Sequence, residues 1–137
     1  MALTHLLDSS VLTRLRHRAV REAIEARAER GELGRAGISD LEIGYSARNA
    51  AEWDRLEEAL CAFELVETTA EHVRRAKQVQ RMLAAKHQRG RKVPDPLIAA
   101  AAESHSLTVL HYDADFDRIA AVTGQSCEWV VPAGSVD

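Results

Sequence analysis

The stretch Leu3-Thr4-His5-Leu6-Leu7-Asp8-Ser9-Ser10 is a short apolar run that ends in one acid and two hydroxyl residues. An apolar run of this length is typical of a buried β-strand. Serine is favoured at the position that caps the N-terminus of a helix. The sequence therefore predicts a strand over residues 3–7, followed at once by a helix through Leu12 and Leu15. Because either serine can cap that helix, we expect the Asp8 carboxylate to be free for chemistry.

The same alternation of strand and helix continues along the chain. Further strands are expected over residues 33–38, 64–67, 107–110 and 128–131, and further helices over residues 19–29, 39–45, 52–63, 69–87, 97–103 and 116–122. Alternating strands and helices favour a mainly parallel sheet that helices cover on both faces. A length of 137 residues is most simply one domain, so residues 1–137 are expected to form a single α/β domain.

Acidic residues stand where these strands end or where the helices begin. They are Asp8, Glu42, Asp95, and the pair Asp113 and Asp115. Ligands of open α/β sheets usually bind at the carboxyl edge, where such side chains would converge. Crowded carboxylates repel one another, and a divalent cation neutralises them. The pattern indicates a metal-dependent site for phosphodiester chemistry.

Two of these acids also have a purely structural interpretation. Ser39 and Glu42 have the spacing of a capping box, in which the glutamate would bond back to the Ser39 N–H. Asp40 would then be the alternative acid that faces the site. Asp95 lies in the first turn of a helix, where the helix dipole stabilises an acid by about 0.3–1 kcal/mol. The prolines on either side of Asp95 fix its backbone, however, which suits a preorganised metal ligand.

The spacing of Asp113, Asp115 and Asp117 suggests a calcium-binding loop, but the rest of the pattern is missing. An EF-hand requires glycine at position six and glutamate at position twelve. This chain has Arg118 and Gly124 there. Asp113 directly follows a strand and is the better candidate for the site. Asp115 is expected to assist it, and Asp117 to lie on a solvated helix surface.

Several cations flank the acids. Arg14 and Arg16 follow Asp8, while Arg91 and Lys92 precede Asp95. Runs of basic residues often form a solvent-exposed surface and nothing more. Because these residues stand next to two of the acids, they could also contact the backbone phosphates of a nucleic acid. His111 lies near the expected site; we favour a spectator role for it over support of a neighbouring ligand or a phosphate contact.

Composition sets broad limits on function. The formal net charge is −3, which argues against a protein that binds nucleic acid by overall charge alone. It does not exclude an enzyme that acts on nucleic acid, because a bound cation reverses the local field of an acidic site. Cys61 and Cys127 lack the spacing of metal ligands. The sequence shows no leader and no run long enough to span a bilayer, so we expect a cytoplasmic protein without membrane attachment.

Three stretches together resemble the PIN-domain family, and among its members the VapC-type toxin ribonucleases. They are Leu6-Leu7-Asp8-Ser9-Ser10-Val11-Leu12, Asp95-Pro96-Leu97-Ile98-Ala99-Ala100-Ala101-Ala102 and Tyr112-Asp113-Ala114-Asp115-Phe116. The resemblance covers almost the whole chain. One position departs from it: the family often has a hydroxyl residue two positions before the late aspartate, where this chain has His111.

The resemblance implies a three-layer α/β/α fold with an acidic pocket that binds Mg²⁺ or Mn²⁺. It implies a toxin endoribonuclease that cleaves structured RNA such as tRNA or rRNA. Members of the family are usually homodimers that a cognate VapB antitoxin holds inactive. Asp8, Glu42, Asp95 and Asp113 match the family's four acids, and Ser9 or Ser10 matches its hydroxyl. In this chain the helix faces around Trp53 and Leu60 are candidates for the dimer surface.

The mechanism that follows is a hypothesis. Asp8 and Asp95 would hold the principal Mg²⁺, with Asp113, Glu42 and Asp115 completing or extending the site. A second ion, if bound, would lie about 3.5–4 Å from the first, and metal-activated water would attack the phosphorus. Arg14, Arg16, Arg91 and Lys92 would contact the RNA backbone. The alternatives are a catalytically degenerate binding module, a phosphotransfer receiver domain, and a nuclease of the same fold that acts on DNA.

Overall fold

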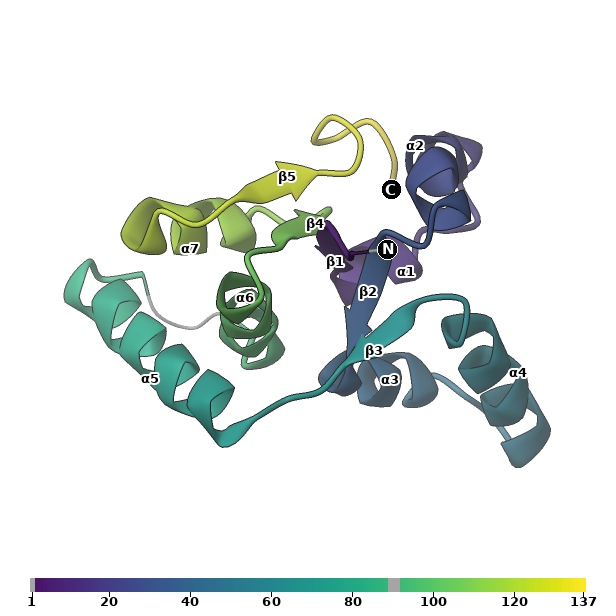
Figure 1. The fold of residues 1–137 in the computed structure, drawn as a ribbon, viewed down its shortest axis with the longest axis horizontal. Coiled ribbons are helices and arrows are strands. Elements are labelled where there is room, and N and C mark those ends of the chain that lie inside the picture. The colour runs from purple at the N-terminus through teal and green to yellow at the C-terminus, as the bar shows by residue number, and fades with distance from the viewer. Residues whose placement is uncertain (1, 89–91) are drawn as a thin grey trace.

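The computed structural model describes residues 2–88 and 92–137 (Figure 1). Its centre is a five-stranded parallel sheet with the strand order β3-β2-β1-β4-β5. The strands are β1 (His5–Leu7), β2 (Leu33–Ala36), β3 (Glu64–Val66), β4 (Thr108–His111) and β5 (Cys127–Trp129). The predicted α/β fold with a parallel sheet is confirmed, with boundaries that differ by a few residues.

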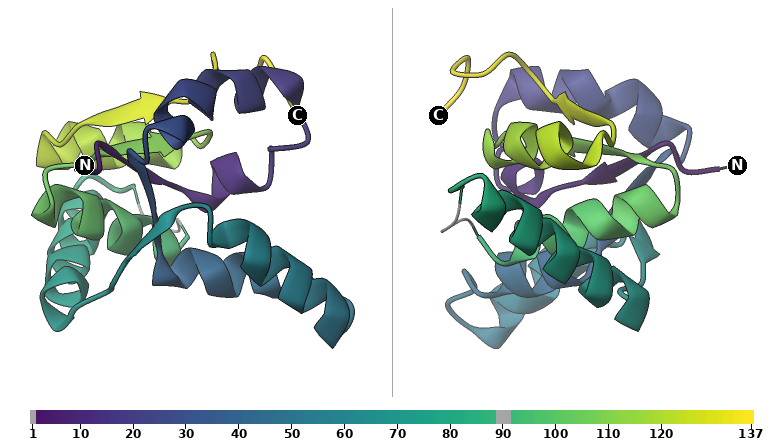
Figure 2. Two further views of the ribbon diagram at one scale, coloured as in Figure 1. Left: turned by 45° about the vertical axis from the view of Figure 1, so that its right-hand side comes forward. Right: turned by 90° about the vertical axis from the view of Figure 1, so that its left-hand side faces the viewer.

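Helices cover both faces of this sheet and form the outer layers (Figure 2). They are α1 (Ser9–Leu12), α2 (Arg18–Glu29), α3 (Gly37–Gly44), α4 (Ala50–Leu60), α5 (Ala70–Ala85), α6 (Pro94–Ser104) and α7 (Asp115–Thr123). Within the described ranges, no helix is both long and apolar enough to cross a membrane.

The core consists of two clusters, one on each face of the sheet. Successive side chains of a strand point to opposite faces, so Leu6 and Leu7 enter different clusters. Leu6 packs with the buried side chains of α5, α6 and α7. Leu7 packs with those of α1, α2 and the end of α4. Because both faces are covered, the apolar runs of β1 and β4 are buried throughout, as expected for a parallel sheet.

The order of the strands determines where the acids lie. β1 is the central strand, with β2 on one side and β4 on the other. From β1 the chain adds β2 and β3 on one side of the sheet and then β4 and β5 on the other. This reversal of the strand order creates a crevice beyond the carboxyl ends of β1 and β4, where ligands of such sheets bind. The two ends are joined by a hydrogen bond from the Asp8 N–H to the Leu110 carbonyl, 3.0 Å long. Asp8 and the residues after β4 are thereby neighbours.

Three local predictions were wrong. The first helix ends at Leu12 instead of continuing to Leu15, and its cap is Asp8 itself, whose Oδ2 accepts from the Ser10 N–H at 2.9 Å. The Asp8 carboxylate is thus not free of a structural role. Ser39 does not cap α3, because α3 begins at Gly37 directly after β2 and Ser39 already lies buried within its first turn. The capping box with Glu42 is therefore absent.

Candidate functional site

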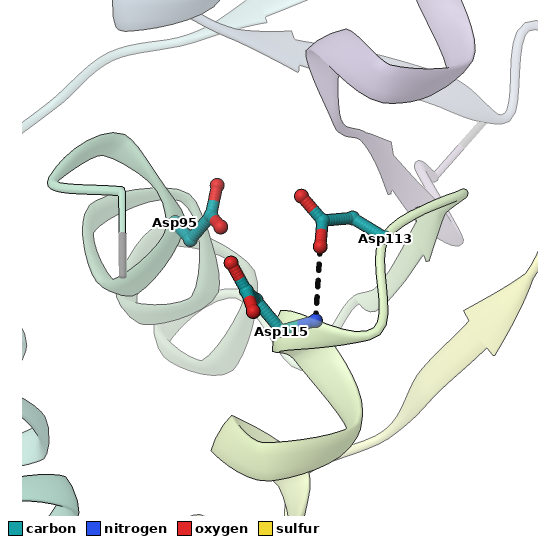
Figure 3. Close-up of side chains that lie close together, drawn as sticks. All are labelled: Asp95, Asp113 and Asp115. Carbon is teal, nitrogen blue, oxygen red and sulfur yellow. Dashed lines mark hydrogen bonds between the residues drawn. The ribbon is translucent and has the colours of Figure 1, made fainter. Parts of the chain in front are cut away.

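Three aspartates meet in front of the carboxyl edge of the sheet (Figure 3). Asp95 comes from the first turn of α6, Asp113 from the turn after β4, and Asp115 from the first turn of α7. Each contributes one carboxylate oxygen, and these oxygens lie within 4.8 Å of one another. Carboxylate oxygens are the ligands that Mg²⁺ and Ca²⁺ prefer. The grouping can therefore coordinate a divalent cation.

Asp95 is the most constrained of the three. It is only 3% exposed, and its Oδ2 has no hydrogen-bond partner in residues 2–88 and 92–137. Burial, together with the nearby negative charge of Asp8, raises the pKa of Asp95 to about 8. A buried carboxylate oxygen without a donor is costly in free energy. A cation bound in front of it would remove that cost, so Asp95 fits the role of a ligand.

Asp8 is equally buried, at 3% exposed, and joins the same site from the other side. Burial raises its pKa, although the hydrogen bond from Ser10 acts in the opposite direction. Asp8 and Asp95 both line an open cavity of about 270 Å³. The other residues that line this cavity are Ser9, Ser10, Thr13, Arg14, Glu42, Ile43 and Lys92. Because Asp95 belongs both to the cavity and to the aspartate group, the acids form one continuous site.

Glu42 reaches the cavity from α3. The Ser9 Oγ donates a hydrogen bond to Glu42 Oε1, and burial raises the pKa of Glu42. The neighbouring hydroxyl has a different role, because Ser10 Oγ accepts from the Tyr112 N–H at 2.8 Å. Ser9 therefore orients an acid, whereas Ser10 connects α1 to the turn after β4.

The alternative acid, Asp40, has a structural role instead. Its carboxylate forms a two-point ion pair with the buried Arg35 guanidinium, at 2.8 and 3.2 Å. Arg35 also donates to the Phe63 carbonyl. A carboxylate used in this way is not available to the cavity, which leaves Glu42 as the acid that α3 contributes.

Asp113 is held by several donors. Its Oδ2 forms an ion pair with Lys92, and its Oδ1 accepts from the Asp115 N–H at 2.9 Å. Burial alone would raise the pKa of Asp113, but these two hydrogen bonds outweigh it and lower the pKa. Asp115 in turn pairs with Arg118 at 3.0 Å. Lys92 thus supplies positive charge to an acid-rich site.

The buried His111 side chain holds the backbone of Asp113 through a hydrogen bond. The imidazole is fully buried, with its ring centroid 5.0 Å from those of Phe116 and Trp129. Its Nδ1 accepts from the Asp113 N–H at 3.2 Å, and burial lowers its pKa. The favoured interpretation as a spectator misses this contact. The available signal was the two-residue spacing, which is that at which Asn and Asp side chains bond a backbone N–H in turns.

The cations expected to contact phosphates differ in position. Arg14 lines the cavity and stacks over the Tyr112 ring, with 4.7 Å between its Cζ and the ring centroid. Lys92 also lines the cavity, paired with Asp113. Arg16 lies on the adjacent surface. Arg91 lies outside the described residues.

Comparison with known proteins identifies what the chain is similar to. The family model for the PIN domain matches residues 5–122. Ribonuclease VapC51 of Mycobacterium tuberculosis is 64% identical over 137 residues, with both chains fully covered. Ribonuclease VapC21 of the same species is 44% identical and covers 98% of this chain and 99% of its own.

Solved structures with the same fold come from toxin–antitoxin complexes. The DNA-bound VapBC of Salmonella typhimurium matches with a TM-score of 0.75 at 20% identity, covering 94% of this chain and 99% of that one. VapBC2 of Rickettsia felis, bound to a promoter DNA fragment, also gives 0.75, at 17% identity, and covers 93% and 98%. At these identities the structural matches establish the fold.

Proposed function

Because the chain belongs to the PIN domain family, we propose that it is a metal-dependent endoribonuclease and the toxin of a toxin–antitoxin pair. The observation that carries this proposal is the buried Asp95 carboxylate, grouped with Asp113 and Asp115, whose Oδ2 has no donor among the described residues. The relatives named ribonuclease support the choice of RNA as substrate.

The residues present fit a divalent cation, for which we propose Mg²⁺ or Mn²⁺. Asp8 and Asp95 would be its principal ligands, and Asp113, Asp115 and Glu42 would complete or extend the coordination. When bound, the cation supplies the Lewis acidity and charge neutralisation that phosphodiester hydrolysis requires. The carboxylates would otherwise repel a phosphate group, so neutralisation by the cation would strengthen binding of the substrate in the cavity.

The remaining residues of the cavity hold the acids and would orient the substrate. Ser9 fixes the Glu42 carboxylate, and His111 fixes the turn that carries Asp113. Arg14 and Lys92 offer their cationic groups to the cavity. Arginine and lysine are the residues that most often contact backbone phosphates. We therefore assign these two cations to the RNA backbone and not to recognition of its bases.

We further propose two protein partners. The VapBC complexes among the structural neighbours support a VapB-type antitoxin as one of them. A second copy of the chain is the other. Exposed apolar side chains on α3, directly after it, on α4 and on β3 favour these elements as the dimer surface; they are Leu41, Tyr45, Trp53 and Leu65. Leu60, which the sequence suggested for that surface, is buried in the core and is not part of it.

Cleavage of total RNA by the purified protein tests the nuclease assignment. We expect discrete fragments with Mg²⁺ or Mn²⁺, none with EDTA, and none from Asp8→Asn with either metal. The products should carry 5′-phosphate and 3′-hydroxyl ends, because the acids would activate water and not the RNA 2′-hydroxyl. Intact RNA under every metal condition, from protein free of antitoxin, would contradict the nuclease assignment and favour the binding-module interpretation. Cyclic phosphate ends would rule out the hydrolytic mechanism.

Substitutions at His111 should separate its hydrogen bond from its packing. Asparagine retains an acceptor for the Asp113 N–H, whereas leucine does not. Both replace a buried aromatic ring, so both should lower the melting temperature. We expect kcat/KM to fall about tenfold further in His111→Leu than in His111→Asn, since tenfold corresponds to about 1.4 kcal/mol and thus to one hydrogen bond. Equal kcat/KM values in the two variants would show that His111 only fills space.

A further inference from the structure

We propose that Arg14, Arg16 and His17 form a phosphate-binding subsite beside the catalytic cavity, and that the Asp137 carboxylate occupies it when no RNA is bound. The three residues are called the basic cluster below. The inference rests on the proposed function for the nature of its ligand, the phosphodiester backbone of RNA. The contacts of Asp137 carry the argument for the subsite itself.

Asp137 contacts all three members of the basic cluster. Arg14 Nε donates to the backbone oxygen of Asp137 at 3.0 Å. The Oδ1 of Asp137 lies 2.7 Å from His17 Nε2 and 3.6 Å from Arg16 Nη2. Two oxygens of one residue therefore lie within hydrogen-bond or ion-pair distance of two guanidinium groups and one imidazole. A phosphate group would likewise offer oxygen acceptors to these donors, and its oxygens are anionic, as is the Asp137 carboxylate.

The two guanidinium groups are oriented by contacts that do not involve Asp137. Arg14 Nη1 donates to the Ser10 carbonyl at 2.9 Å, and the guanidinium stacks on Tyr112. Arg16 Nη1 donates to the Thr13 carbonyl at 2.8 Å. These contacts would remain if Asp137 moved away. The basic cluster is thus preorganised for an anion, whichever anion is present.

Asp137 itself is easily displaced. Its side chain is 84% exposed, and ion pairs between exposed groups are weak and are screened by salt. The residue before it is better anchored: the Val136 N–H donates to Tyr112 Oη at 3.1 Å, and Tyr112 Oη donates to the Val136 carbonyl at 2.7 Å. Asp137 can therefore leave the basic cluster while Val136 stays in place.

The basic cluster adjoins the catalytic cavity, so exchange of Asp137 for a phosphate group would affect the substrate site. Arg14 belongs both to the basic cluster and to the wall of the catalytic cavity. Lys92 also lines that wall and is paired with Asp113. Among the described residues, both of these wall cations therefore contact an acidic residue of the same chain, Arg14 through the backbone oxygen of Asp137 and Lys92 through the carboxylate of Asp113. RNA that enters across the basic cluster would exchange Asp137 for a phosphate and release Arg14 to the substrate.

Binding of a short fluorescein-labelled oligouridylate in EDTA, followed by anisotropy, tests the proposal without cleavage. We expect Asp137→Asn to bind about three- to tenfold more tightly than wild type at low salt. The slope of log Kd against log salt concentration should also steepen, by about 0.7 for each cation released to the single strand. Asp54→Asn, the same change of charge on the exposed surface of α4, is the matched control and should not show this gain. Adding Arg16→Gln to Asp137→Asn should remove most of the gain.

Three results would overturn the subsite. They are equal affinities of Asp137→Asn and Asp54→Asn, a gain that persists in full with Arg16→Gln, and no oligouridylate binding by any variant. The test is independent of the nuclease assignment. If RNA is cleaved but Asp137→Asn gains nothing, the subsite fails and the nuclease stands. If Asp137→Asn shows its specific gain but no RNA is cleaved, the subsite stands and the nuclease fails.

Discussion

Asp95→Asn is expected to lower the rate of RNA cleavage by about a thousandfold, which corresponds to about 4 kcal/mol of transition-state stabilisation. Asp95 is the acid shared by the cavity and the aspartate group. The substitution changes the volume of the side chain little but removes the charge that would bind the cation. The fold should persist, because the Asp95 Oδ2 has no hydrogen-bond partner to lose among the residues that the structure describes.

The measurement is single-turnover cleavage of a mapped RNA fragment in saturating Mg²⁺. Asp54→Asn serves as control, because Asp54 is an exposed acid on α4, and its activity should equal that of wild type. Circular dichroism and the melting temperature establish that each variant is folded. A folded Asp95→Asn protein with near-normal activity would remove Asp95 from the catalytic site.

The second large effect concerns pH in the absence of metal. The pKa of Asp95 is about 8 in the folded protein, against 3.8 for an ordinary aspartate. Between these two values the unfolded chain has lost the proton that the folded chain retains, so the free energy of unfolding falls as the pH rises. Burial raises the pKa of Asp8 and Glu42 as well, which acts in the same direction. The lowered pKa of Asp113 has the opposite effect, because it makes the free energy of unfolding rise with pH, but only at acidic pH.

In EDTA we therefore expect the protein to melt at a lower temperature at about pH 8 than at about pH 5. The free energy of unfolding should be lower at the higher pH by an amount on the order of a few kcal/mol. Mn²⁺ should reverse that loss at the higher pH, because it binds the ionised carboxylates of the folded state. Asp95→Asn should show a much smaller dependence on pH and on Mn²⁺. If wild type and Asp95→Asn had parallel pH profiles in EDTA, burial of Asp95 would not be the cause.

Features set by the strands and helices were predictable from sequence. The apolar runs at β1 and β4 predicted buried parallel strands, and parallel strands bring the residues after them to one edge. Asp8 and Asp113 were accordingly expected at the same place. α6 was equally clear, since Pro94 and Pro96 at its start and the apolar residues after them predict a buried helix.

The partners of the acids were not predictable, because they are distant in sequence. Ser9 and Glu42 are 33 residues apart, and Lys92 and Asp113 are 21 apart. Local patterns were also ambiguous: Asp8 and its serine neighbours are all good caps, and only the backbone decides between them. Ser39 and Glu42 have the spacing of a capping box, yet the helix starts before Ser39. The contact of Asp137 with Arg14 spans 123 residues and has no local signal.

We propose that the buried acids hold a divalent cation and that RNA cleavage depends on this cation. The most direct test is a titration with Mn²⁺ in which ion binding and RNA cleavage are measured on the same samples. Bound Mn²⁺ is obtained from the loss of the electron paramagnetic resonance signal of the free ion. We expect cleavage to rise in proportion to bound Mn²⁺ in wild type, whereas Asp95→Asn should neither bind the ion tightly nor cleave. Cleavage that proceeds in EDTA, or Mn²⁺ binding that is unchanged in Asp95→Asn, would contradict this proposal.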